Sequence, residues 1–484
     1  MSGRIVRREH YLKMLAEFKD EPLVKIITGM RRCGKSTLME MFISDIKKSG
    51  VPEENIIHIN FEDPRYAHIQ NGDALLKEVM AATELRDGVY LFFDEIQDVK
   101  EWEKAINSMR FAGADVYITG SNAKLLVSDF STYLSGRYVE IEMYPLSFRE
   151  YVDFVEKENT YKDKLQQIIK EYFDSAVGKK ENDQQHHLFE YIDFPEGENI
   201  DRDKMQQIIK EYFDSVIGKR DNNRQLSLVE YADPLYGEIV NKDKLLSDYM
   251  LCGGLPYVVL ERKSERNTDM ILSAIFDTVF IKDIVERNVI KDVAAIRNVA
   301  KFVMKNIGNT TSVKSVSDYI VSKGGRITRP TVDAFLDYLE SAYLIYRARK
   351  YDVKKKEYLH TSDKFYISDL GIGNSIVGYG DNDFSGLIEN IVYMELLFRG
   401  KKVAVGNIDG NEIDFIVMGK DTREYYQVTT ELYSQNVKER EVRSLKMVQD
   451  NFPKTIITFQ SYPFKNIEGI KVISLADFLL EDFE

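Results

Sequence analysis

The segment LVKIITGMRRCGKST, residues 23–37, decides the fold class of this chain. Its first six residues are mostly apolar and β-branched, which predicts a buried strand. The following residues have the spacing G-x-x-x-x-G-K-S, in which Gly29 and Gly34 let the main chain curl so that successive N–H groups face a phosphate. A helical pattern begins at once, and the positive end of a helix favours the same anion. This order predicts an α/β domain with a parallel sheet, rather than a simple glycine-containing turn.

The loop also supplies candidate contacts for a nucleotide. The side chain of Lys35 offers a mobile positive charge to the phosphates, and the hydroxyl of Ser36 is placed to bind Mg²⁺. The residues that we expect to bind the nucleotide are Gly29, Arg32, Cys33, Gly34, Lys35, Ser36 and Thr37. ATP and Mg²⁺ are therefore the expected ligands.

A second motif, VYLFFDEIQ at 89–97, ends an apolar strand with two carboxylates. Asp94 would orient Mg²⁺ through its water shell, and Glu95 would act as the general base on the attacking water. Two adjacent acids after a strand are common by chance. Because they follow Lys35 by about 60 residues, a Walker B motif is the favoured interpretation.

Two further polar residues are candidates for the same reaction. The strand DVYIT, 115–119, leads into Asn122, which would position the lytic water or sense the γ-phosphate; the alternative is a polar turn or a helix cap. Arg137 follows Gly136 between two hydrophobic stretches. It is a candidate arginine finger that acts in the site of a neighbouring subunit, and an ordinary surface salt bridge is the alternative. The finger interpretation implies a homo-oligomer.

Composition limits the remaining classes. The 66 Lys and Arg residues against 79 Asp and Glu residues give a formal charge of −13, which argues against a uniformly basic coat on nucleic acid. Only two cysteines occur, so a disulfide framework or a cysteine-based zinc site is not expected. No stretch has the length and apolar character of a signal peptide or a membrane span. We expect a cytoplasmic protein that makes no membrane contact.

The middle of the chain contains a tandem duplication. DKLQQIIKEYFDSAVGK at 163–179 recurs as DKMQQIIKEYFDSVIGK at 203–219, with 14 of 17 positions identical and an offset of 40 residues. Each copy predicts one amphipathic helix. We interpret residues 156–245 as a helical insertion, which is either a tolerated arm or a surface for a partner protein.

A basic segment lies further along the chain. Helical patterns from residue 296 onward and a β-hairpin expected in YRARKYDVKKKEYLH, 346–360, predict a winged helix. Residues 323–356 contain nine basic and four acidic side chains. This segment could neutralise DNA phosphates, or it could contact a protein.

The C-terminal part resembles the PD-(D/E)xK nuclease core. A helix at 387–400 is followed by three expected strands, and Glu395 and Asp414 match the first two carboxylate positions of that resemblance. At the third position stand Gln427 and Thr429, where an acid and a lysine are expected. Metal would be held weakly and water activated poorly, so this domain is expected to be inactive.

Residues 20–155 as a whole resemble a family of bacterial and archaeal AAA-type ATPases. The resemblance rests on GMRRCGKST, FFDEIQ, TGSNAKLL and LSGRYVEIEMYPLSFREY, and it continues through LCGGLPYVV and IKDIVERNVI. It implies an ATPase domain at 1–155, the helical insertion at 156–245, a helical segment and winged helix at 246–362, and a restriction-endonuclease-like domain at 363–484.

These observations favour an ATP-hydrolysing machine or switch that acts on a nucleic-acid or protein partner. Two alternatives remain. One is a DNA nuclease gated by ATP, and the other is a non-catalytic scaffold that binds proteins through the repeat arm.

Overall fold

The computed structural model describes residues 7–122, 136–158, 242–262, 264–359, 362–378 and 384–482. It divides into two compact units, one made of Met1–Arg149 with Asp248–Glu484 and the other of Glu150–Ser247. The helices α6 (Phe148–Glu158) and α11 (Lys242–Cys252) lie where the chain passes from one unit to the other. The repeats at 163–179 and 203–219, and with them most of the predicted insertion, lie outside the described residues.

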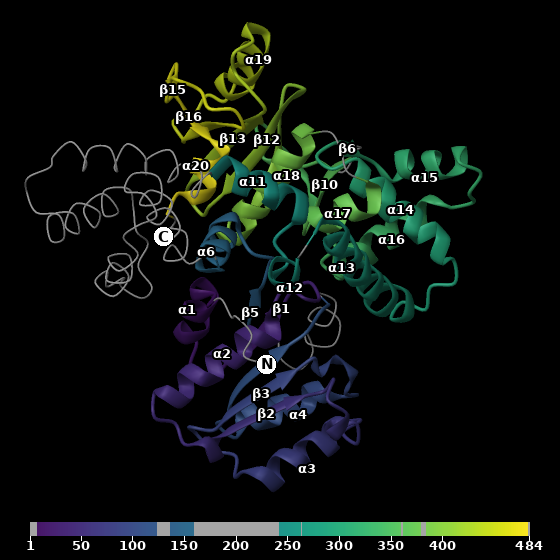
Figure 1. Cartoon of the computed structure of the whole chain (residues 1–484), viewed down its shortest axis with the longest axis vertical. Helices are drawn as coiled ribbons and strands as arrows, with labels where there is room; N and C mark the ends of the chain where they lie inside the picture. Colours follow the sequence, from purple (N-terminus) through teal and green to yellow (C-terminus); the bar gives the residue numbers. More distant parts are fainter. Residues whose placement is uncertain are drawn as a thin grey trace, which may run out of the picture. The chain divides into compact units, whose positions relative to one another are not determined.

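An all-parallel sheet forms the N-terminal part (Figure 1), which confirms the predicted α/β class. Its order is β2-β3-β4-β1-β5, so that one strand separates β1 from β3. The strands are β1 (Val24–Thr28), β2 (Ile56–Asn60), β3 (Tyr90–Asp94), β4 (Asp115–Thr119) and β5 (Tyr138–Glu142). The three inner strands are buried along their whole length, as expected when helices cover both faces of a parallel sheet.

Helices cover both faces of this sheet (Figure 1). Alternate strand residues point to opposite faces, so Ile26 and Phe93 pack in one apolar cluster while Ile27 and Phe92 pack in another. The helices are α1 (Glu9–Glu17), α2 (Lys35–Lys48), α3 (Gly72–Ala82) and α4 (Trp102–Phe111), with short 3₁₀ turns at Glu53–Asn55, Pro64–Tyr66 and Ile96–Asp98. α3 and α4 belong to the first cluster, and α1 and α2 belong to the second.

A helical segment and a small sheet follow. The helices are α12 (Pro256–Glu261), α13 (Glu265–Thr278), the π-helical turn η5 (Val279–Glu286), α14 (Val293–Lys305), α15 (Val313–Ser322), α16 (Arg329–Ser341) and α17 (Leu370–Val377). The strands β6 (Thr310–Thr311), β7 (Ile345–Ala348) and β10 (Asp363–Ile367) form an antiparallel sheet of order β6-β10-β7.

The C-terminal part contains an eight-stranded mixed sheet of order β15-β16-β14-β13-β12-β11-β8-β9. The strands are β8 (Lys350–Asp352), β9 (Glu357–Tyr358), β11 (Val403–Ile408), β12 (Asn411–Met418), β13 (Arg423–Thr429), β14 (Lys454–Thr458), β15 (Asn466–Ile467) and β16 (Ile470–Ser474). The helices are α18 (Phe384–Phe398), α19 (Gln435–Lys446) and α20 (Leu475–Leu480). The helix and three strands predicted after residue 387 are present.

The prediction of one hairpin at 346–360 is confirmed only for the strands β8 and β9. β7 pairs with β10 in the small sheet, whereas β8 pairs with β9 and joins β11 of the larger sheet. The chain changes sheets at Arg349, because Tyr351 and Val353 pack in the C-terminal apolar cluster. The segment between β7 and β10 therefore connects the two sheets, because its strands β8 and β9 belong to the larger sheet.

Candidate functional site: a phosphate-binding loop at one edge of the parallel sheet

The loop between β1 and α2 has the backbone conformation that its glycines allow. Gly29 has φ +134°, and a Cβ there would lie 2.1 Å from the carbonyl oxygen of Met143. Gly34, immediately before α2, has φ +104°. Other residues adopt these angles only with strain, so both positions require glycine. The curled loop ends at the N-terminus of α2, where main-chain N–H groups lack helical partners and attract an anion.

Lys35 is the first residue of α2 and is 4% exposed. Its Nζ donates hydrogen bonds to the carbonyl oxygens of Gly29 at 3.0 Å and Met30 at 3.2 Å. The same atom lies 3.7 Å from Oε1 of Glu95. The ammonium is thus held inside the loop, facing the acidic end of β3.

The other loop residues differ in their surroundings. Ser36 and Thr37 are half-buried in the first turn of α2. Cys33 is fully buried, and burial raises the pKa of its thiol, so this thiol does not act as a nucleophile at neutral pH. The Arg32 side chain is exposed, and its guanidinium lies 5.4 Å from the ring centre of Tyr257.

Asp94 ends β3 and is 1% exposed. Its carboxylate accepts a hydrogen bond from the hydroxyl of Thr119 and another, at 3.2 Å, from Nδ2 of Asn60. These partners are the last residues of the two strands beside β3. We did not predict these two residues from the sequence, although their place at the ends of neighbouring parallel strands was a usable signal.

Glu95 follows Asp94 with φ +55° and is 7% exposed. Its N–H donates to Oγ1 of Thr119 at 2.9 Å, and its Oε2 accepts from Nε2 of Gln97 at 2.5 Å. Burial opposes ionisation, but the positive charge of Lys35, the Gln97 hydrogen bond and the charge of Arg31 together lower the pKa of Glu95. The carboxylate is therefore ionised at neutral pH and able to accept a proton.

Asn122, the residue predicted to position the lytic water, also lies at the carboxyl edge of the parallel sheet. Asn122 is 3% exposed and follows β4 by three residues. The structure thus brings the loop, Asp94, Glu95 and Asn122 to the carboxyl ends of β1, β3 and β4. Oγ of the adjacent Ser121 donates to Oδ1 of Asp283 at 3.4 Å. Asp283 lies in η5, outside the sheet, and was not predicted from the sequence.

Arg137 lies apart from these residues. It is exposed, it precedes β5, and its carbonyl oxygen accepts a 3.0 Å hydrogen bond from the N–H of Val24, the first residue of β1. Because β1 and β5 are parallel, Arg137 is at the amino ends of the strands and the phosphate loop is at their carboxyl ends. Arg137 does not reach the loop of its own chain.

Several side chains of the predicted basic segment form ion pairs with carboxylates. Arg347 pairs with Asp337 at 3.0 Å and Glu340 at 3.3 Å, and Lys350 pairs with Glu412 at 3.0 Å. Lys354 pairs with Asp409, and Lys355 lies 3.9 Å from Glu357. Four of the nine basic residues therefore have carboxylate partners, and the positive charge available for a phosphate backbone is smaller than the sequence count indicates.

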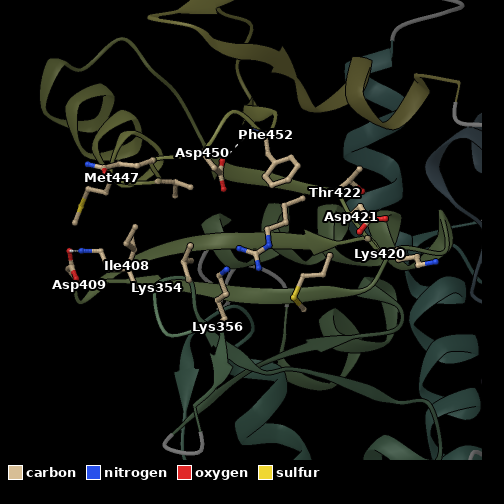
Figure 2. Close-up of a pocket in the computed structure, with 16 residues that line it drawn as sticks. Lys354, Lys356, Ile408, Asp409, Lys420, Asp421, Thr422, Met447, Asp450 and Phe452 are labelled. Atoms are coloured by element: carbon tan, nitrogen blue, oxygen red, sulfur yellow. Dashed lines mark hydrogen bonds and ion pairs between the residues drawn. The ribbon is translucent and has the colours of Figure 1, made fainter.

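Part of that segment lines a cavity of about 830 Å³ in the C-terminal part. Figure 2 shows Lys354 and Lys356 on one side of it, with Lys420 and Asp421 from the β12–β13 turn and Phe452 from the opposite wall. The lining contains charged side chains of both signs, which are Lys354, Lys356, Lys420 and Arg423 on the basic side and Asp409, Asp421 and Asp450 on the acidic side.

The C-terminal acids surround a lysine. Nζ of Lys364, on β10, lies 2.9 Å from Oε2 of Glu389, 2.8 Å from Oε1 of Glu412 and 3.7 Å from Oδ1 of Asp414. Burial and the neighbouring Glu389 raise the pKa of Asp414. The main-chain N–H of Val428 also donates to Asp414, at 2.8 Å.

The prediction that Glu395 is the helix carboxylate of this cluster was wrong. Glu395 forms an ion pair with Arg399 at 2.7 Å, and the α18 acid that joins Asp414 around the lysine is Glu389. Gln427 and Thr429 are buried on β13, where the Gln427 amide oxygen accepts a hydrogen bond from Ser444 and the Thr429 hydroxyl donates to the carbonyl oxygen of Glu431.

The residues that the structure describes lack two features. They contain no group of three or more His, Cys, Asp or Glu side chains arranged to hold a metal ion. Within the same residues, no helix has both the length and the apolar character that a membrane crossing requires. Ser36 in the first turn of α2 and Asp94 at the end of β3 supply a hydroxyl and a carboxylate, which are oxygen ligands of the kind that Mg²⁺ prefers.

The strand order, the curled loop and the acids at one sheet edge have the arrangement of a P-loop nucleotide-binding domain. A family model described as an AAA domain matches residues 21–152. A second model, described as a domain of unknown function (DUF8612), matches residues 243–383.

An uncharacterized protein of Haemophilus influenzae is 33% identical over 485 residues, which cover 99% of this chain and 100% of that protein. The chain belongs to the same family as this protein. The uncharacterized protein MJ1544 of Methanocaldococcus jannaschii is 26% identical to this chain, and the match covers 98% of this chain and 88% of that protein. Among solved structures, the Walker-type ATPase Paby2304 of Pyrococcus abyssi is similar with 15% identity and a TM-score of 0.43, over 77% of this chain and 96% of that one.

Proposed function

We propose that this protein binds ATP with Mg²⁺ and hydrolyses it at the carboxyl edge of the parallel sheet. The observation that carries the proposal is the facing pair of Lys35 and Glu95, whose charged atoms are 3.7 Å apart at the end of the phosphate loop. A cation for the phosphates and an ionised base for water are thereby held within one buried site.

The residues divide the chemistry between them. The N–H groups of Gly29–Thr37, Arg32 and Cys33 included, and the ammonium of Lys35 bind and orient the triphosphate. Ser36 and Asp94 would hold Mg²⁺, which neutralises phosphate charge when bound. Glu95 takes a proton from the attacking water, and Asn122 orients that water with its amide.

Arg137 is proposed to act on a second copy of the chain. Its exposure and its distance along β5 from the loop of its own chain support a role across a subunit contact. An arginine that enters a neighbouring site stabilises charge on the transferring phosphoryl group. The active form is then a homo-oligomer.

The C-terminal parts are proposed to transmit the nucleotide state to a partner. The succession α14, β6, α15, α16, β7 and β10 is typical of a winged helix, and α18, β11, β12, β13, α19 and β14 follow the order of the PD-(D/E)xK core. The partner is either DNA or a protein. The outer face of α16 carries the exposed acids Asp333 and Asp337, which disfavours insertion of this helix into a DNA groove.

The alternative of an ATP-gated nuclease is less well supported. The Lys364 ammonium already lies beside Glu389 and Asp414, where it would oppose a bound cation, and no acid or lysine stands at Gln427 or Thr429. A scaffold function would depend on the repeat arm, and deletion of residues 165–244 with unchanged assembly would count against it.

The deciding experiment measures ATPase rate with and without double-stranded DNA over a series of salt concentrations. A rate that rises with DNA, and rises less at high salt, supports a nucleic-acid partner because phosphate contacts are screened by salt. A rate that DNA does not change supports a protein partner. Absence of nucleotide binding and of phosphate release would refute the ATPase itself. DNA cleavage that requires Mg²⁺ and vanishes in Asp414→Ala would favour the nuclease alternative.

A further inference from the structure

Asp283 is a buried carboxylate that the helical segment presents to the nucleotide site. It is 2% exposed and lies in η5, a π-helical turn, an element that occurs frequently at functional sites. Its Oδ2 accepts a hydrogen bond from Nε of Arg31 at 3.0 Å, and its Oδ1 lies 3.4 Å from Nη2 of the same side chain. Oγ of Ser121, next to Asn122, donates to Oδ1 at 3.4 Å.

Arg31 extends from the phosphate loop across the carboxyl edge of the sheet. Its Nη1 donates to Oε1 of Glu62 at 2.7 Å, two residues after β2 ends. Since β4 and β3 lie between β1 and β2, this reach carries the guanidinium over the strand ends that bear Asn122 and Glu95. The charge of Arg31 also contributes to the lowered pKa of Glu95.

The guanidinium keeps donors for a ligand. Arginine has five N–H groups, and the hydrogen bonds to Asp283 and Glu62 use three of them among the described residues. Two carboxylates therefore fix the plane of the guanidinium while leaving N–H groups for phosphate oxygens, for which planar guanidinium has high affinity.

We propose that Asp283 is a positioning residue of the nucleotide site: it holds Arg31 over the site of γ-phosphate transfer and ties the helical segment to the loop that carries Asn122. This inference rests on the proposed ATPase function and adds to it that turnover depends on the placement of a segment outside the sheet. The neighbouring contact of Tyr257 with Arg32 places α12 of the same segment against the loop as well.

The test compares Asp283→Asn, Asp283→Ala and Arg31→Ala in the full-length chain. We expect Asp283→Ala to lower kcat about tenfold or more with little change in KM, because misplacing a group at the reacting centre affects the transition state more than binding. Asp283→Asn, which keeps the shape and one acceptor, should retain more activity. The double variant with Arg31→Ala should be no slower than Arg31→Ala alone, because both remove one interaction.

Asp277→Ala is the matched control. Asp277 is an exposed acid on α13 that pairs with Arg297 at 3.1 Å, and its loss should leave kcat unchanged. The inference fails while the ATPase proposal stands if three results are found together. These are that the native chain turns over ATP, that Glu95→Gln is inactive, and that both Asp283 variants have the kcat of the control. Additive losses in the double variant would equally overturn it. If Asp283→Ala lowers the melting temperature, Asp283→Asn decides, and full kcat in that variant would refute the role. A native chain that neither binds nor hydrolyses ATP would refute the proposed function first.

Discussion

Nζ of Lys35 and Oε1 of Glu95 lie 3.7 Å apart, although Lys35 begins α2 and Glu95 follows the end of β3. Each side chain is nearly enclosed by protein, and the positive charge of Lys35 favours the ionised form of Glu95 by lowering its pKa. A triphosphate that enters the loop would interact with the cation directly and would meet the carboxylate only through water. Binding and hydrolysis should therefore be separable by mutation.

Lys35→Ala should weaken nucleotide binding about 10- to 100-fold, because charge-assisted hydrogen bonds to phosphate are lost. Titration with a fluorescent ATP analogue measures the change. Lys47→Ala alters an exposed residue of the same helix, paired with Glu53, and should bind as the native chain does. Equal affinities for Lys35→Ala and the native chain would contradict the assignment.

Glu95→Gln should bind ATP with nearly native affinity and hydrolyse it about 10²- to 10⁴-fold more slowly, because the amide cannot accept the proton of water. Phosphate release under single-turnover conditions checks this. Glu101→Gln, at an exposed residue close by on the chain, serves as the control. Normal release from Glu95→Gln would remove this residue from the reaction.

Arg137→Ala should lower turnover by about 10³-fold if it acts in trans. Mixing this variant with Lys35→Ala should restore part of the activity, since a mixed contact can contain one intact arginine and one intact loop. Activity per chain should also rise with protein concentration. Arg65→Ala, at an exposed arginine paired with Asp63, is the control. Failure of the mixture to recover any activity would argue for a surface role.

Glu142→Gln should make the protein less sensitive to alkaline pH. Burial raises the pKa of Glu142 from 4.5 to about 7, against a hydrogen bond from Tyr346. A carboxyl group with a raised folded-state pKa stabilises the fold below pH 4.5, and this contribution is lost as pH rises to about 7. The variant should exceed the native chain in free energy of unfolding by up to about 3 kcal/mol at pH 8 and by little near pH 5. Denaturant unfolding at both pH values tests this, with Glu54→Gln, an exposed acid, as control.

Lys364→Met should destabilise the C-terminal part by about 3–5 kcal/mol at pH 8, because it leaves buried carboxylates without a cation. The loss should shrink at pH 5, where burial favours protonation of Glu389 and Asp414. Lys471→Met removes an exposed lysine that pairs with Glu481 and should have a small effect. An unchanged melting temperature for Lys364→Met would show that the cluster does not depend on this lysine.

The sequence by itself determined the parallel sheet, the phosphate loop and the acids of β3. Strand, loop and helix are contiguous at residues 24–48, so Gly34 and Lys35 are positioned by local backbone geometry, whereas Glu95 is positioned by the end of the buried apolar strand β3. Such features depend on spacing along the chain, which a single sequence records.

Only the tertiary structure decided which distant residues complete each site. Arg31 and Asp283 are 252 positions apart, and their contact depends on how the helical segment packs against the loop. Glu389 and Glu395 lie on the same helix, yet six residues turn the helix by about 240°, so just one of them faces Asp414. The chain likewise passes from the small sheet to the larger sheet at Arg349 because Tyr351 packs in the C-terminal apolar cluster. The charge and hydropathy of a residue indicate that it could form such a contact, but the packing of distant segments determines which residues do.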